Sequence, residues 1–295
     1  LGSGASKTVT PSATTTYTVT GTSTAGCTGT ATVNVTVNPI PAAIAVNVGP
    51  YCEGDTLHLI LYTDVGNGSF IWEGPMNFIS TNQNPEIINA TPLMNGIYTV
   101  TVTSEFGCTN SSSTMVSVNP NPILQATANP QTICLGQSTT LQATGADNYA
   151  WSNGLGINQS VIVSPTITTT YTVTGTRNSC TGSTSIIVVV NPAPTVSVSN
   201  TGPYCPGSTI QLNLNTNGFS YNWSGPNSYT STTEDPIILN ATPMMTGTYS
   251  VTVMSAAGCT SSASTNVVVN PAPTVSASNT GPYCPGSTIQ LNLNT

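Results

Sequence analysis

The sequence predicts an all-β protein built from repeated β-sandwich domains, and three observations support this. Charged residues make up only 4% of the chain, and 26 glycines and 22 prolines place turns throughout it. Apolar residues alternate with Thr, Ser and Asn in short runs, the period of a strand with one buried face. A marker of the form Val-Asn-Pro-x-Pro returns at intervals of roughly 70 to 80 residues, the size of a small domain.

The markers set the expected domain boundaries. Two prolines in four residues cannot continue a sheet ladder, so each marker ends a strand and begins a short, extended linker. Residues 274–295 repeat 195–216 with Ala277 in place of Val198, which indicates duplication within a longer array. We expect complete domains at 42–122, 123–194 and 195–273, the C-terminal part of a domain at 1–41, and the N-terminal part of another at 274–295.

The 195–273 repeat shows the strand pattern most clearly. Ile210, Leu212 and Leu214 alternate with polar residues, and no segment has a helical period. Short strands separated by Gly, Pro, Asn and Ser turns at this spacing predict a β-sandwich. The expected strands are 195–200, 209–215, 220–224, 237–239, 248–254 and 264–270.

Each complete repeat contains a Cys, then a Trp, then a Cys. We expect the two cysteines of one repeat to form a disulfide that joins two loops at one end of its sandwich. Such a bond closes a loop of about 50 residues and contributes roughly 4 kcal/mol in the chain-entropy model. The expected pairs are Cys52 with Cys108, Cys134 with Cys180 and Cys205 with Cys259, while Cys27 and Cys284 are expected to have partners outside the sequence.

Cysteine usage and charge limit the compartment and the partners. Eight cysteines beside a single histidine favour disulfides over a mixed Cys/His metal site, and disulfides favour an extracellular or cell-surface location. A net charge of −7 with only two basic residues excludes nucleic acid and anionic membrane surfaces as partners. No apolar run reaches the roughly 18 residues of a membrane helix, and residues 1–4 do not resemble a signal peptide.

The recurring aromatic residues could belong to the core or to a binding surface. Trp72, Trp151 and Trp223 could stack on glycans, but a Trp that recurs on the third strand is more often a core residue. A tyrosine that recurs at the start of a later strand is typical of a corner residue that packs inward. These core tyrosines are Tyr98, Tyr171 and Tyr249, with Tyr17 at the corresponding place in the first segment.

Candidate catalytic and metal-binding residues are few. His58 lies between two leucines, so the alternation turns it toward solvent, and a triad built on it would exist in one repeat only. Glu53 and Asp55 could bind calcium, but Pro206 and Ser208 replace them in the third repeat. The adjacent pair at 234–235 is interpreted as a solvated loop. We therefore expect no catalytic residue, no metal and no cofactor.

Several motifs together resemble a known style of repeat. These are Tyr-Cys-x-Gly-x-Thr, a Trp about 18 residues later, Gly-x-Tyr-x-Val-x-Val, Gly-Cys-Thr and the proline marker. They are similar to the Ig-like and PKD-like repeats of very large secreted surface proteins of Bacteroidota, including repetitive adhesins linked to gliding motility. The resemblance implies Ig-like sandwiches and export. It also makes Thr56, in Asp55-Thr56-Leu57, a candidate O-glycosylation acceptor, the alternative being a plain turn before a strand.

We therefore expect a structural segment of an extracellular surface filament or adhesin stalk, and not an enzyme. The expected partners are neighbouring repeats of the same chain and identical chains in a fibre. Two alternatives stay open: an array that binds glycans or another surface, and a spacer within a larger secreted enzyme. Exposed aromatic residues at one loop end of every repeat would favour the binding array.

Overall fold

A computed structural model of the chain describes residues 6 to 294. Within that range the fold is almost entirely strands and turns, and its helices are four 3-10 turns of three residues each. None of these helices is long and apolar enough to cross a membrane. The all-β prediction is confirmed. The five-domain division stays a prediction, and residues 1–5 and 295 of its outer segments lie outside the described range.

The structure separates into two compact units. The first comprises Leu1–Gln125, Thr144–Ala150 and Thr174–Thr184, and the second comprises Ala126–Ala143, Trp151–Val173 and Ser185–Thr295. The 42–122 repeat therefore lies in the first unit and the 195–273 repeat in the second.

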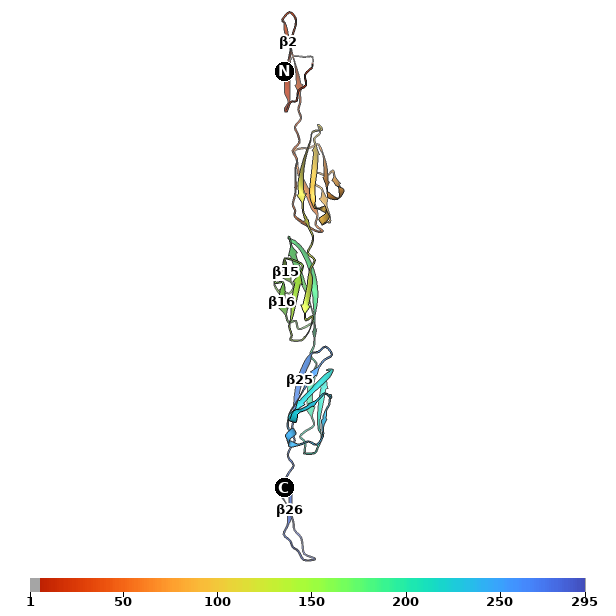
Figure 1. Cartoon of the computed structure of the whole chain (residues 1–295), viewed down its shortest axis with the longest axis vertical. Coiled ribbons are helices and arrows are strands. Elements are labelled where there is room, and N and C mark those ends of the chain that lie inside the picture. The colour runs from red at the N-terminus through yellow and green to blue at the C-terminus, as the bar shows by residue number, and fades with distance from the viewer. Residues whose placement is uncertain (1–5, 295) are drawn as a thin grey trace. The chain divides into compact units, whose positions relative to one another are not determined.

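The 42–122 repeat forms three sheets, drawn in orange and yellow in Figure 1. One has the order β10-β9-β6-β7, one has the order β3-β5-β8, and β11 pairs with β4. All pairings are antiparallel except the last, which is parallel. The elements are β3 Ile44–Asn47, β4 Tyr51–Cys52, β5 Leu57–Tyr62, β6 Ser69–Gly74, η1 Pro75–Asn77, β7 Phe78–Ser80, β8 Glu86–Ile87, η2 Pro92–Met94, β9 Gly96–Thr103, β10 Thr109–Val116 and β11 Val118–Asn119.

Alternation along β5 and β9 builds the core of this repeat. Leu57, Leu59 and Leu61 point inward from β5, and their polar or exposed neighbours point outward. Each such side chain contributes about 1.5–3 kcal/mol when fully buried. Trp72 of β6 is 0% exposed, and its indole Nε1–H donates to the carbonyl of Gln83 at 3.1 Å, so its polar atom is satisfied inside the core.

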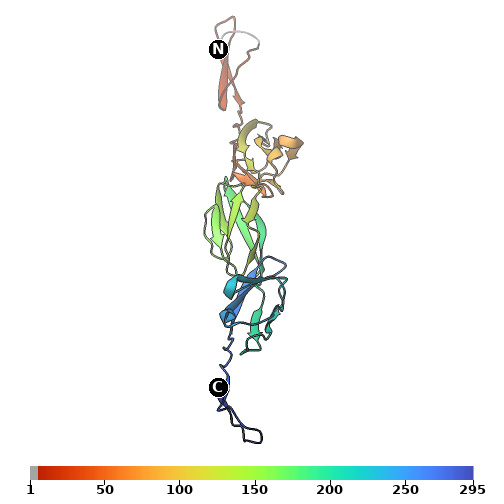
Figure 2. The same cartoon turned by 60° about the horizontal axis from the view of Figure 1, so that its bottom comes forward.

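The 195–273 repeat has the same arrangement, seen from a second direction in the cyan and blue part of Figure 2. Its sheets have the orders β22-β21-β24-β25 and β19-β20-β23, and Tyr204 forms a parallel bridge with Val269. Leu212 and Trp223 are 0% exposed in its core. The elements are β19 Val196–Asn200, β20 Ile210–Thr216, β21 Ser220–Gly225, η3 Pro226–Ser228, β22 Tyr229–Ser231, β23 Ile237–Ile238, η4 Pro243–Met245, β24 Gly247–Met254 and β25 Thr260–Val267.

Two strands of this repeat differ from expectation. β22 (Tyr229–Ser231) was not expected at all. The last strand was expected at 264–270, but β25 begins at Thr260, directly after Cys259. Its first half, Thr-Ser-Ser-Ala-Ser, is small and mostly polar because one face is open to solvent, so the sequence gives little apolar signal there.

Residues 125–191 carry the shorter repeat. Its sheets have the orders β12-β14-β16 and β13-β18-β17-β15. Its strands are β12 Gln125–Asn129, β13 Thr132–Cys134, β14 Thr139–Thr144, β15 Asn148–Trp151, β16 Ser160–Val163, β17 Thr169–Arg177 and β18 Cys180–Asn191.

Each outer segment contributes one pair of strands. β1 (Thr15–Thr22) pairs with β2 (Thr28–Val35), and β26 (Ser276–Asn279) pairs with β27 (Leu291–Asn294), both antiparallel. Most of their described side chains are exposed, because no second sheet covers either pair among the described residues.

Candidate functional site

Two disulfides link cysteines of successive sequence repeats. Cys52 of the 42–122 repeat bonds Cys180 of the 123–194 repeat, with their Cα atoms 5.4 Å apart, and lies in the first unit. Cys134 of the 123–194 repeat bonds Cys259 of the 195–273 repeat at 5.6 Å, and lies in the second unit. Both separations are in the usual range for a disulfide.

The eight cysteines fall into two positional types. A first cysteine opens the turn Cys-x-Gly-x, and these are Cys52, Cys134, Cys205 and Cys284. A second cysteine closes the hairpin before the last strand of a repeat, and these are Cys27, Cys108, Cys180 and Cys259. Each observed bond joins a first cysteine to the second cysteine of the repeat that follows.

The expected pairing within each repeat is wrong, and the length of the last strand explains why. Cys108 immediately precedes β10, whereas Cys52 sits beside Asn119 of β11, in parallel register. The chain from Cys108 to Asn119 spans about 11 residues, or about 36 Å at 3.3 Å per residue. A disulfide requires Cα atoms within about 7 Å, so Cys52 and Cys108 cannot pair.

In the shorter repeat, too, the last strand separates the two cysteines. Cys180 opens β18, a strand of 12 residues, and Cys134 pairs in register with Asn191 at its other end. Cys134 and Cys180 are therefore too far apart to bond. The third expected pair, Cys205 with Cys259, is wrong too, because Cys259 bonds Cys134.

The first cysteine turn is fixed by a glycine and a reciprocal hydrogen bond. Asp55 donates its backbone N–H to the carbonyl of Cys52 at 3.0 Å and accepts the N–H of Cys52 on its carboxylate Oδ2 at 2.7 Å. Gly54 between them has φ +92°, which favours glycine. Gln137 replaces Asp55 in the shorter repeat, and its side-chain Oε1 accepts the N–H of Cys134 at 3.0 Å.

The second cysteine turn is built in two ways. In the long repeats a serine four residues earlier closes it: Ser104 donates its N–H to the carbonyl of Cys108 at 2.9 Å, and its Oγ accepts the N–H of Cys108 at 3.2 Å. In the shorter repeat the turn is only Asn178-Ser179, both with positive φ, as a two-residue hairpin requires. Both constructions place the cysteine at the start of the last strand.

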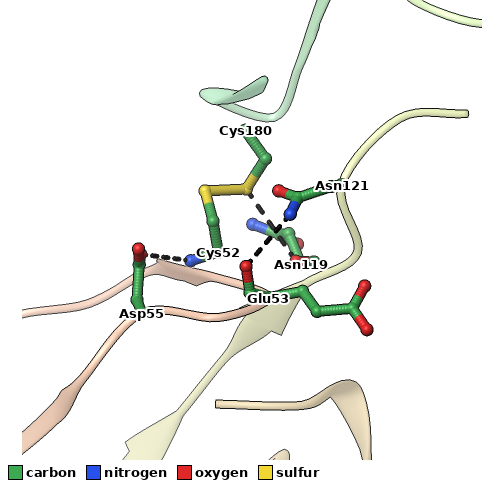
Figure 3. The surroundings of a disulfide bond; sticks show 6 residues. All are labelled: Cys52, Glu53, Asp55, Asn119, Asn121 and Cys180. Carbon is green, nitrogen blue, oxygen red and sulfur yellow. Dashed lines mark hydrogen bonds between the residues drawn. A yellow bond between two sulfur atoms is a disulfide. The ribbon is translucent and has the colours of Figure 1, made fainter. Parts of the chain in front are cut away.

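The asparagine of the proline marker, Asn119, lies beside the disulfide of Cys52 and Cys180 (Figure 3). Asn119 O accepts the N–H of Glu53, next to Cys52, at 2.9 Å and lies 3.9 Å from Cys180 Sγ. Asn121 of the linker donates from Nδ2 to the carbonyl of Glu53 at 3.0 Å. Asn119 at the end of one repeat thus lies against both cysteines of the bond, and Asn121 of the linker holds the residue next to Cys52.

The second disulfide repeats this geometry. Asn191 O accepts the N–H of Leu135, next to Cys134, at 3.0 Å and lies 3.8 Å from Cys259 Sγ. The marker asparagine at the end of each repeat is visible in the sequence. Its place beside the disulfide could be predicted only once the parallel pairing of the first cysteine with the end of the repeat was known.

Four cysteines of the described residues form no disulfide: Cys27, Cys108, Cys205 and Cys284. Cys27 and Cys284 were expected without partners in this sequence, but Cys108 and Cys205 were expected to be bonded.

The aromatic residues singled out from the sequence are buried in the complete repeats. Trp72 and Trp223 are 0% exposed and Trp151 is 5% exposed, so none of the three offers a ring face to a ligand. Tyr98, Tyr171 and Tyr249 are buried too. Burial raises the pKa of Tyr98 and, together with the nearby Tyr229, that of Tyr249; burial also raises the pKa of Tyr171, which a hydrogen bond with Thr169 partly offsets.

The remaining polar candidates form no centre. His58 Nδ1 lies 3.2 Å from Glu86 Oε1, and both side chains are exposed to solvent. Asp235 Oδ1 accepts the N–H of Leu214 at 2.7 Å, and Asp55 is occupied by the cysteine turn. In the described part of the chain, no three His, Cys, Asp or Glu side chains come together as metal ligands. Thr56 is half-buried immediately before β5, and its glycosylation stays a prediction.

Comparisons with known proteins concern the fold. No protein-family model matches the chain, and no curated protein matches it. The chain is similar to the N-terminal eight Ig domains of Down Syndrome Cell Adhesion Molecule isoform 1.30.30, with 16% identity, a TM-score of 0.46, and coverage of 87% of this chain and 40% of that one. This chain therefore spans less than half the length of that structure.

Two further structures are similar over most of their lengths. Extracellular domains 3–5 of Drosophila OTK share 13% identity and a TM-score of 0.33 over 75% of this chain and 93% of that chain. The three N-terminal domains of the bacteriophage RB49 highly immunogenic outer capsid protein share 16% identity and a TM-score of 0.38 over 79% and 100%. At these TM-scores the likeness carries no conclusion about activity or partners.

Proposed function

We propose that this chain is a structural segment of an extracellular surface filament or adhesin stalk, in which disulfides join each repeat covalently to the next. The observation that carries the proposal is the pairing of Cys52 with Cys180 and of Cys134 with Cys259. Because each bond links two repeats, a pulling force can pass from one repeat to the next through the disulfide as well as through the linker. Such bonds persist in oxidising compartments, which supports a location outside the cytoplasm.

The bonds also shorten the covalent path through the chain. With both disulfides formed, the shortest route from Cys52 to Cys259 runs through about 46 residues, those between Cys134 and Cys180. That stretch extends to about 170 Å, whereas the same region with reduced cysteines extends over about 207 residues, or about 750 Å. A segment that keeps its length under load is suited to a stalk.

A pulling experiment on single molecules tests this proposal. The chain is held at its two ends, and its full extension is measured in oxidising and in reducing buffer. We expect reduction to lengthen the region between Cys52 and Cys259 by about 580 Å. Cys180→Ser should lengthen it by about 130 Å, because the shortest route then runs from Cys52 to Cys134 along the backbone. Cys108→Ser is the matched control and should leave the extension unchanged; equal extension in both buffers would refute the proposal.

A glycan- or surface-binding array is less well supported. It would require exposed aromatic residues at one loop end of each repeat. Phe106 and Phe219 are exposed, but the first lies in the second cysteine turn and the other precedes β21, so they are not equivalent positions. Neither this array nor a spacer in a secreted enzyme has a specific observation in its favour.

A further inference from the structure

Cys108 and Cys205 share most of the local structure of the cysteines that are bonded. One difference is that Pro206, after Cys205, lacks the N–H that Glu53 and Leu135 donate to the marker carbonyl. Cys108 closes a hairpin with the same two hydrogen bonds to Ser104 that Cys259 makes with Ser255, at 3.2 Å from the N–H to the serine Oγ and 2.8 Å from the serine N–H to the Cys259 carbonyl. Cys259 is bonded and Cys108 is not. The difference is therefore not in the turn that carries the thiol.

The marker asparagine beside Cys108 also corresponds to the asparagines beside the bonded second cysteines. Cys108 Sγ lies 3.8 Å from the carbonyl of Asn38, in the Val-Asn-Pro marker that precedes its repeat. Bonded Cys180 and Cys259 lie at 3.9 and 3.8 Å from the corresponding carbonyls of Asn119 and Asn191. At both bonded sites a first cysteine pairs in register with that asparagine. At Asn38 no first cysteine occupies this place among the described residues.

Cys205 shows the complementary half. Gly207 has φ +82°, as Gly54 and Gly136 do in the turns of bonded Cys52 and Cys134. Ser208 donates its N–H to the carbonyl of Cys205 at 3.1 Å, as Asp55 does to Cys52. Tyr204 forms its parallel bridge with Val269, so Cys205 lies beside the end of its repeat, next to Asn270. The turn that would carry a second cysteine to this point is absent from the described residues.

We infer that Cys108 and Cys205 are the two halves of further bonds of the same kind. Cys205 forms a disulfide with a second cysteine whose turn lies against Asn270. Cys108 forms a disulfide with a first cysteine whose turn lies against Asn38. The partner in each case is the complementary turn of another repeat of this type, in the same polypeptide or in a second copy of the chain. This inference rests on the proposed function, because it extends the same linkage.

The chemistry needs an oxidant, for which a small-molecule disulfide such as oxidised glutathione suffices. The Cys205 thiolate attacks the glutathione disulfide, forms a mixed disulfide and releases one glutathione thiolate, which takes up a proton. The thiolate of the second cysteine then attacks the Cys205 sulfur and releases the other glutathione. Two protein thiols lose two electrons and two protons, and one oxidised glutathione becomes two reduced molecules.

An extended chain tests the pairing directly. Residues 274–295 correspond to 195–216, so a copy of residues 217–273 fused after Thr295 completes the last repeat and supplies a copy of Cys259. The chain is folded in a glutathione redox buffer, free thiols are alkylated, and linked peptides are identified by mass spectrometry without reduction. We expect Cys205 to be linked to the copied Cys259 and to lose its reactivity with the alkylating reagent.

The control replaces the copied cysteine by serine, and Cys205 should then be alkylated. A bond between Cys284 and the copied Cys259, or an alkylated Cys205 in the extended chain, would overturn the inference. The same digest reports Cys52 with Cys180 and Cys134 with Cys259: if these are absent the proposed function fails, and if they are present while Cys205 stays free only the further inference fails.

An experiment on the unmodified chain shows whether the partner cysteine belongs to the same polypeptide or to a second copy. It is concentrated in the same buffer and separated by size without reduction. Multimers linked from Cys205 to Cys108 support the inference and assign the partner to a second copy. A monomeric unmodified chain, with Cys205 bonded in the extended chain, supports it with the partner in the same polypeptide. Multimers linked through two copies of Cys108 or two of Cys205 would contradict the complementary pairing.

Discussion

The long 42–122 repeat and the shorter 123–194 repeat place their cysteines alike although they are built differently. The long repeat has 3-10 turns η1 and η2 and the extra strand β7, and the shorter repeat has no counterpart of them in the described structure. Their second cysteine turns differ too, with a serine-closed turn at Cys108 and a two-residue turn at Cys180. Both nevertheless have a first cysteine beside the end of the last strand and a second cysteine at its start. The last strand of a repeat, and not its loops, therefore determines where the two cysteines of the repeat lie.

The largest effect is expected when one disulfide is removed and the other stays intact. Cys52→Ser breaks a disulfide whose cysteines are 128 residues apart. In the chain-entropy model this loses about 5 kcal/mol of the free energy of unfolding. Cys108→Ser in the same repeat should change that free energy by less than about 0.5 kcal/mol, since its thiol has no partner. Denaturant unfolding followed by Trp fluorescence measures both, and equal losses would contradict the account.

The core tryptophans test whether the two kinds of repeat share one type of core. Trp72→Ala and Trp151→Ala should each destabilise their own repeat by about 3–5 kcal/mol, because each removes a buried indole and leaves the carbonyl of Gln83 or Asn158 without its donor. Phe106→Ala, at an exposed aromatic residue, should cost less than about 0.5 kcal/mol. A small effect at Trp151 alone would mean that the shorter repeat is packed differently.

The first cysteine turns should respond alike to loss of their glycine. Gly54 and Gly136 have φ +92° and +89° with open space around the position of a Cβ atom, so alanine there meets backbone strain and no clash. Each substitution should cost about 1–2 kcal/mol. Gly66→Ala is the control, because Gly66 also has open space but not a left-handed φ, and it should be neutral or slightly stabilising. Thermal unfolding compares the three variants.

The smallest expected effect is a pH dependence. Burial raises the pKa of Tyr98 above its ordinary value of 10.0, so the folded repeat keeps the phenol neutral where the unfolded chain has begun to ionise. Its contribution is fully present below pH 10 and is lost as pH rises through the folded pKa. Unfolding of the 42–122 repeat should therefore become easier above about pH 10, and Tyr98→Phe should weaken that trend. An identical alkaline slope in both proteins would exclude this role for Tyr98.

The sequence predicted the all-β class and the two kinds of cysteine turn, because strand alternation and Cys-x-Gly are local signals. The domain boundaries drawn from the proline marker stay a prediction. The sequence did not predict which cysteines pair. That depended on two non-local facts: the parallel pairing of Tyr51 and Cys52 with Val118 and Asn119, and a last strand that starts immediately after the second cysteine. The start of that strand was missed at Cys259 because its first residues are small, polar and solvent-facing. Placing that start at Thr260 would have separated the two cysteines of each repeat by a full strand.

Peptide mapping of the oxidised chain shows whether the disulfides join successive repeats. Free thiols are alkylated first, the unreduced chain is digested with pepsin, and linked peptides are identified by mass spectrometry. We expect peptides that link Cys52 to Cys180 and Cys134 to Cys259, with alkylated Cys108 and Cys205 in the monomer. Peptides that link Cys52 to Cys108 or Cys134 to Cys180 would contradict this pairing.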